Sequence, residues 1–291
     1  RFNTPDLSPD RRTFEAIEAM ILACHARGGA MHIWPWGDNG RRQNLNAVPN
    51  TGGINGVVDK RLQRYIAARL GPLPGWSMGY GYDLFEWVNG PELTEWHDYM
   101  QQNLGWFHFL GARGNKNEVI HSQISETMDY NSYEQHHFRF DFDDWVSTYQ
   151  DRPGKPSFSE DRFRITGDTR PKNFDGTADS RRLMWDLALA GGIAGIWGDL
   201  DPRVGDGGSS PYADKATLKT FDVFWNDQQR FLETMENRSD VADAGTRALV
   251  SRDDENWVLY KENTNRITVE LSGFSGSKPV IAVDATAAYS E

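Results

Sequence analysis

The apolar positions of the chain follow two spacings in turn, one typical of helices and one of strands. Helical spacing predicts helices over about 9–27, 54–70, 132–149 and 215–235. It also predicts a helix that begins at Pro91 and one that carries Leu183 and Leu187. Ser8 is the expected N-cap of the first helix, and Ser132 is expected to begin the fourth. Short apolar runs predict the strands, which are "AMHIWPW", "WSMGYGYD", "FHFLGAR", "VIHSQIS", "KPSFSED" and "GIAGIWGD".

Strands that alternate with helices indicate an α/β fold with a parallel sheet. The six strands, preceded by one helix, match a (β/α)8 TIM barrel whose first two strands are absent from this chain. A doubly wound open sheet is the alternative. Polar or aromatic residues close almost every strand, as they do in barrel enzymes, so we expect an N-terminally incomplete barrel over 1–240.

The pattern changes after Asp240, where short alternating segments with turn residues between them replace the helical spacing. These segments are "RALVS", "NWVLY", "RITVEL" and "PVIAVD". We expect a small all-β, sandwich-like module over 243–291. A module of this size is marginal by itself, so it should pack against the barrel.

Composition and charge limit the kinds of molecule that the protein could bind. The formal net charge of -11 argues against nucleic acid, which needs a basic face. Eleven Trp, 10 Tyr and 15 Phe suit stacking against sugars. The single Cys24 leaves no internal disulfide, and no apolar run is long enough for a membrane span. The chain opens with Arg1 and shows no signal peptide, as a processed or truncated chain would, and we expect a secreted or periplasmic location rather than a cytoplasmic one.

Two carboxylates close strands that would be the fourth and seventh of a complete barrel. Asp83 ends "GYGYD" and Glu160 ends "KPSFSE". Glycoside hydrolysis needs such a pair, one acting as acid and one as base or nucleophile. A helix cap or a loop ion pair is the structural alternative for each residue, and Glu86 competes with Asp83 for the acid role.

Further polar and aromatic side chains fall at the same ends of successive strands, where a substrate pocket would lie. The candidates for substrate contacts are His32, Trp34, Trp36, Asp38, Tyr82, Glu86, Arg113, His121, Glu126, Trp197 and Asp199. Glu126 has a structural role as its alternative.

Other chemistries lack a motif. "GYGYDL" has Leu84 where a dinucleotide fingerprint needs its third glycine, and no G-x-S-x-G elbow is present. The adjacent His136 and His137 lack metal-ligand spacing. We therefore expect no cofactor and no metal.

"KPSFSEDRF", followed by a helix that carries "RRLMWDLALAGGIAGIWGD", resembles the apiosidase-like (β/α)8 glycoside hydrolases, a retaining family of the clan-A type. These enzymes often carry a C-terminal β module of a collagen-binding type. The resemblance implies that Glu160 is the nucleophile, Asp83 the acid/base, and Trp197 the floor of a sugar subsite. Tyr82 departs from the wider clan, which has Asn at that position.

The sequence thus predicts a retaining glycoside hydrolase that cleaves a plant, algal or microbial polysaccharide or oligosaccharide through a covalent glycosyl-enzyme. The second hypothesis is a non-catalytic carbohydrate-binding barrel. The third is a metal-dependent barrel hydrolase that uses His32, Asp38 and His121. The sugar, the linkage and the oligomeric state stay open.

Overall fold

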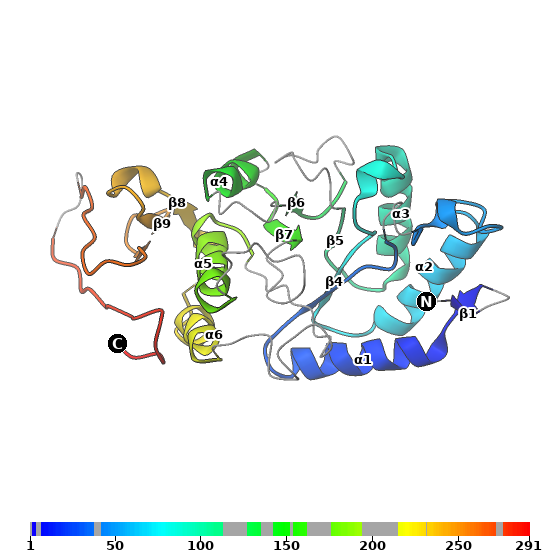
Figure 1. Ribbon diagram of the computed structural model, residues 1–291, viewed down its shortest axis with the longest axis horizontal. Helices are drawn as coiled ribbons and strands as arrows, with labels where there is room; N and C mark the ends of the chain where they lie inside the picture. The colour runs from blue at the N-terminus through cyan, green and yellow to red at the C-terminus, as the bar shows by residue number, and fades with distance from the viewer. Residues whose placement is uncertain are drawn as a thin grey trace. The chain divides into compact units, whose positions relative to one another are not determined.

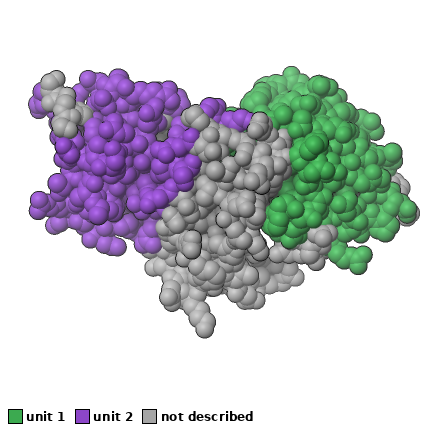
Figure 2. Space-filling model, turned by 90° about the horizontal axis from the view of Figure 1, so that it is seen from above, with its two compact units in different colours: residues 1–134 green, residues 135–291 purple. Residues whose placement is uncertain are grey.

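The computed structural model describes residues 2–3, 7–37, 42–112, 127–134, 142–151, 154–161, 176–193, 215–230, 232–271 and 276–291. The chain forms two compact units, Arg1–Glu134 and Gln135–Glu291 (Figure 2). The expected division near residue 243 stays a prediction.

The first unit is built on a parallel sheet whose strand order follows the sequence, β3-β4-β5. The strands are β3 (Met31–Ile33), β4 (Trp76–Gly79) and β5 (Leu110–Gly111). Helices α1 (Arg11–His25), α2 (Val57–Leu70) and α3 (Gly90–Asn103) alternate with them (Figure 1). The remaining elements are the short pair β1 (Phe2–Asn3) and β2 (Ser8–Pro9), the 3-10 turns Leu45–Ala47 and Leu84–Glu86, and β6 (Asn131–Glu134). The predicted alternation of parallel strands and helices is confirmed here.

The helix starts follow from their capping residues. Asp10, not Ser8, caps α1, because its carboxylate accepts a hydrogen bond from the Arg12 N–H at 3.0 Å. At α3, Asn89 and Glu92 form a capping box, each side chain accepting from the other's backbone N–H at 3.0 and 2.9 Å.

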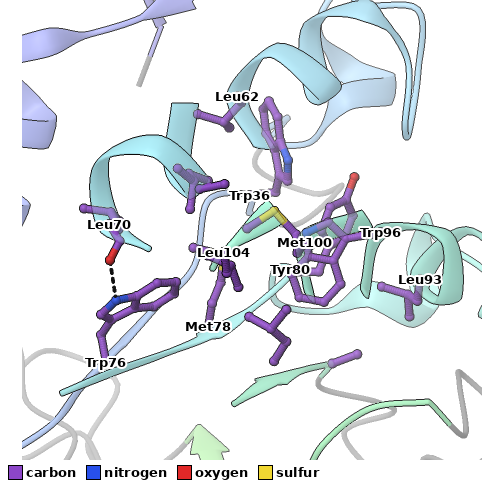
Figure 3. Close-up of a cluster of buried hydrophobic side chains, with 14 of the residues drawn as sticks. Trp36, Leu62, Leu70, Trp76, Met78, Tyr80, Leu93, Trp96, Met100 and Leu104 are labelled. Carbon is purple, nitrogen blue, oxygen red and sulfur yellow. Dashed lines mark hydrogen bonds between the residues drawn. The ribbon is translucent and has the colours of Figure 1, made fainter. Parts of the chain in front are cut away.

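The sheet of the first unit has two different faces because side chains alternate along a strand. Trp76 and Met78 of β4, with Tyr80 beyond it, belong to a core that also contains residues of α2 and α3 (Figure 3). The labelled members of this core are Trp36, Leu62, Leu70, Trp76, Met78, Tyr80, Leu93, Trp96, Met100 and Leu104. His32 and Ser77 are paired in the β3–β4 register and lie on the other face.

One helix predicted near the boundary of the two units begins later than expected. The helix expected from Ser132 is wrong at its start, because Asn131–Glu134 is strand β6 and the helix α4 covers Phe142–Asp151. The next elements are β7 (Ser157–Asp161), α5 (Gly176–Leu189) and α6 (Lys215–Asp222). A π-helical turn, Val223–Asp227, ends the helical segment earlier than residue 235. Phe158 and Ile193 form a parallel bridge where the strand "GIAGIWGD" was expected to begin.

The C-terminal residues form a three-stranded antiparallel sheet of order β10-β9-β8. Its strands are β8 (Met235–Asn237), β9 (Arg247–Ser251) and β10 (Trp257–Tyr260). "RALVS" and "NWVLY" are therefore strands as predicted, whereas residues 279–284 form no strand. In "RITVEL" only a bridge between Val269 and Ala242 is present. The 3-10 turns Leu232–Thr234 and Ser239–Val241 flank β8.

Candidate functional site

Four aromatic rings of the first unit form a row near the ends of β3 and β4. The ring of His32 lies edge-on to Trp34, with centroids 5.5 Å apart, and to Tyr130 at 6.0 Å. Trp34 in turn lies 5.6 Å from Tyr82, tilted by 58°. We call Tyr130, His32, Trp34 and Tyr82 the ring row.

Hydrogen bonding and close packing hold the inner end of the ring row. His32 Nδ1 lies 2.8 Å from the Ser77 hydroxyl of the neighbouring strand. Gly111 leaves room for Tyr130, since a Cβ at that position would lie 2.1 Å from the Tyr130 ring. A larger residue at 111 would displace the ring that contacts His32.

The outer end of the ring row depends on the loop after β3. The Tyr82 hydroxyl donates a hydrogen bond to the side-chain carbonyl of Gln43. Gly37 lets these groups meet, because a Cβ there would lie 2.5 Å from Gln43 and 2.8 Å from the Tyr82 hydroxyl oxygen. The Trp87 indole also donates to the Tyr82 carbonyl at 3.4 Å.

Asp83 directly follows the ring row at the end of β4. Its backbone is left-handed, with φ 51° and ψ 41°, a conformation that Asp and Asn tolerate better than most residues. The Asp83 carbonyl accepts the Glu86 N–H at 3.0 Å and so opens the 3-10 turn Leu84–Glu86. Asp83 is half-buried, whereas Glu86 is exposed.

A buried carboxylate on α2 connects the two strand ends from the core side. Asp59 has no exposed surface and accepts hydrogen bonds from the Trp36 indole at 3.0 Å and the Tyr80 hydroxyl at 2.7 Å. Gln63 and the Asn55 N–H donate to it at 2.8 and 3.0 Å. Desolvation raises the pKa of Asp59, and these hydrogen bonds oppose the rise.

Of the residues predicted from sequence, the structure brings together His32, Trp34 and Tyr82, and Asp83 directly follows Tyr82 along the chain. Trp36 lies apart from them in the buried core. Glu160 lies in β7, in the other unit. Asp38, Arg113, His121, Glu126, Trp197 and Asp199 lie outside the described residues. The roles given to all of these residues stay predictions.

Sequence reasoning missed Tyr130, Ser77, Gln43 and Asp59. A polar pair at helical spacing, Asp59 and Gln63, interrupts the apolar face of α2 beside Leu62 and Ile66, and that interruption was the available signal for Asp59. Tyr130 and Gln43 gave no signal because they lie in irregular segments.

Two further observations concern the described residues alone. No three His, Cys, Asp or Glu side chains among them are grouped so that they could hold a metal ion. None of the helices in that part of the chain has both the length and the apolarity needed to cross a membrane.

Comparisons with known proteins give a fold relationship. The structure is similar to a glycoside hydrolase family 5 protein from Bacteroides vulgatus ATCC 8482, with a TM-score of 0.66 and 15% identity over 94% of this chain and 67% of that one. It is also similar to a second solved structure described as a glycoside hydrolase, with a TM-score of 0.57 and 14% identity over 90% of this chain and 79% of that one. No protein-family model matches the sequence, and a search of curated proteins found no match.

The neighbours are (β/α)8 barrels, so the chain has a TIM-barrel-like α/β fold. In such folds the carboxyl ends of the strands carry the chemistry. The ring row and Asp83 lie at that end of β3 and β4.

Proposed function

We propose that the protein is a retaining glycoside hydrolase acting on a plant, algal or microbial polysaccharide or oligosaccharide. The observation that carries this proposal is the position of Asp83, a half-buried carboxylate that follows the ring row at the end of a barrel strand. Aromatic rings bind the apolar faces of sugars, and a neighbouring carboxylate can then reach a glycosidic oxygen. Both solved neighbours are described as glycoside hydrolases, which supports the same class.

In the proposed mechanism Glu160 attacks the anomeric carbon and the glycosidic bond breaks, which leaves the sugar joined to the Glu160 carboxylate. Asp83 donates its proton to the departing oxygen and then takes a proton from the water that hydrolyses the intermediate. A retaining mechanism requires the two carboxyl groups to lie roughly 5 to 5.5 Å apart.

The finer assignment is to the apiosidase-like family, with a C-terminal collagen-binding-type module over 243–291. It rests on the motifs at 155–163 and 181–199, which resemble that family. Trp34 and Tyr82 would then contact the sugar beside the scissile bond, and His32 would hydrogen-bond to it.

The test measures hydrolysis of a panel of aryl glycosides and plant polysaccharides, with the anomeric configuration of the first product followed by NMR. We expect retention for the wild-type protein, loss of activity for Glu160→Gln, and a fall of about 10²- to 10⁴-fold for Asp83→Asn. The Asp83→Asn loss should be largest on substrates with poor leaving groups, which need the proton most.

Glu86→Gln is the matched control, because Glu86 is an exposed carboxylate on the turn that Asp83 opens. If Glu86→Gln loses activity and Asp83→Asn keeps it, the acid role moves to Glu86. Product inversion would exclude Glu160 as nucleophile. A protein that binds oligosaccharides without hydrolysing any substrate would be a carbohydrate-binding barrel instead.

A further inference from the structure

The buried carboxylate of Asp59 holds two strand ends at once. Its Oδ1 accepts from the Trp36 indole of the segment after β3, and its Oδ2 accepts from the Tyr80 hydroxyl of the segment after β4. Gln63 and the Asn55 N–H also donate to Oδ2, and Asn55 has the unusual φ of 57°. The carboxylate therefore joins the segment after β3, through Oδ1, to the segment after β4, through Oδ2.

The two anchored rings belong to the core, and each is close in sequence to a member of the ring row. Trp36 comes two residues after Trp34, and Tyr80 comes two residues before Tyr82. The regular pairing of β3 and β4 ends at Ile33 and Met78. Beyond it, the described pairing of these segments is a single bridge between Trp36 and Gly81. On its other side the Tyr80 N–H donates to the Gly111 carbonyl of β5 at 3.1 Å. The Asp59 hydrogen bonds thus join the two segments to each other beyond the point where the β3–β4 ladder ends.

The arrangement needs a carboxylate in particular. An amide at position 59 would place an N–H group against the Trp36 donor in one orientation, and against the Asn55 and Gln63 donors in the other. A buried carboxylate without charge compensation is costly, so it persists where several donors satisfy it together. Desolvation raises the pKa of Asp59, and the hydrogen bonds from its donors oppose that rise.

We propose that Asp59 is a positioning residue that fixes the orientation of Tyr82 and Asp83 through Trp36 and Tyr80. This inference rests on the proposed function, in which Asp83 is the proton donor. Because Asp59 acts through the strand ends and not on substrate, it should influence proton delivery more than the attack at the anomeric carbon.

The experiment compares Asp59→Asn and Tyr80→Phe with Ile66→Val in the full chain. Ile66 is 3% exposed and lies on the same helix, so its shortened side chain weakens the core while every hydrogen bond of Asp59 is kept. Amide hydrogen exchange of the peptides covering residues 34–37 and 79–87 is measured first. Kinetics then compare a glycoside having an activated leaving group with one having a poor leaving group.

We expect exchange in these two peptides to become about tenfold faster in Asp59→Asn and in Tyr80→Phe, while peptides of α3 keep their wild-type rates. Misplacement of the proton donor should lower kcat on the poor leaving group about tenfold to a hundredfold, with a smaller loss on the activated one. Ile66→Val should change both substrates equally, as a general loss of stability would.

Equal losses on the two substrates in Asp59→Asn, or unchanged exchange at 79–87, would overturn the positioning role. A wild-type protein without hydrolytic activity would defeat the proposed function separately. The exchange data would then decide alone whether Asp59 anchors the strand ends.

Discussion

The indole of Trp185 on α5 stacks on the phenol of Tyr260 on β10, with centroids 5.2 Å apart and planes inclined by 8°. Beside this stack, Arg181 forms a two-pronged ion pair with Glu262 at 3.2 and 2.9 Å. The Tyr260 hydroxyl donates to the same carboxylate. The C-terminal sheet is thus attached to α5 by both stacking and charge.

Replacing Tyr260 separates these two contributions. Tyr260→Phe keeps the stacked ring and loses the hydroxyl, whereas Tyr260→Leu loses both. We expect Tyr260→Leu to lower the free energy of unfolding by about 0.5–1.5 kcal/mol more than Tyr260→Phe does. Urea denaturation of the two variants measures this difference, and equal losses would show that the stack does not stabilise the unit.

Asp186 gives the second unit a pH-dependent stability. Burial raises the pKa of Asp186 from 3.8 to about 6, against the opposing charge of Arg247, whose Nε lies 3.4 Å away. The folded state therefore binds more protons than the unfolded state between these values, and the Asp186 contribution to stability falls as pH rises from about 4 to 6. Above about pH 6 the folded state carries the full free-energy cost of burying the ionised Asp186 carboxylate.

Asp186→Asn should remove that dependence. The unfolding free energy of the variant minus that of the wild type should therefore increase by up to about 3 kcal/mol as the pH rises from 4 to 7. Denaturation curves at several pH values measure the difference, and Asp143→Asn, an exposed change on α4, is the control. A constant difference across this range would contradict the prediction.

Gly111→Ala tests the inner end of the ring row. The added Cβ would overlap the Tyr130 ring, so we expect a loss of 1–3 kcal/mol or more in the free energy of unfolding, about the cost of overpacking. Gly154→Ala is the control, since no atom lies within 4 Å of a Cβ at that position. Chemical denaturation measures both variants. If Tyr130→Ala in the Gly111→Ala background recovers no stability, the overlap is not the cause.

Trp34→Leu tests the ring row as a sugar platform. If the proposed function holds, loss of the indole removes a stacking surface and should raise KM about tenfold, with a smaller effect on kcat. Steady-state kinetics measure the change, and Trp106→Leu is the control because Trp106 is 52% exposed and precedes β5 at the opposite end of the sheet. Equal effects of the two changes would remove Trp34 from the binding site.

Local pattern predicted much of this fold because helices and strands bury regular sets of side chains. Leu62 and Ile66 of α2 are buried as their spacing indicates. The predicted helix start at Ser132 was wrong. The helical spacing of Phe142, Trp145 and Tyr149 does not mark where the helix begins, and the sequence does not show that residues 131–134 form a strand.

The candidate site was predictable where strand alternation holds and not where it breaks. His32 and Trp34 share a face, and the same alternation would place Trp36 with them. A bend at Pro35 breaks the pattern, and the Trp36 indole binds Asp59 in the core. Asp59 and Tyr130 depend on contacts between segments that only the folded chain brings together.

The left-handed backbone of Asp83 also restricts which substitutions this position can accept during evolution. Asp, Asn and Gly adopt such a conformation with little strain, whereas Glu lacks the short side chain that helps Asp there. A lineage that began with Asp at this turn would reach Asn or Gly more readily than Glu. As long as the loop keeps this left-handed turn, a carboxylate at position 83 is expected to be Asp and not the longer Glu.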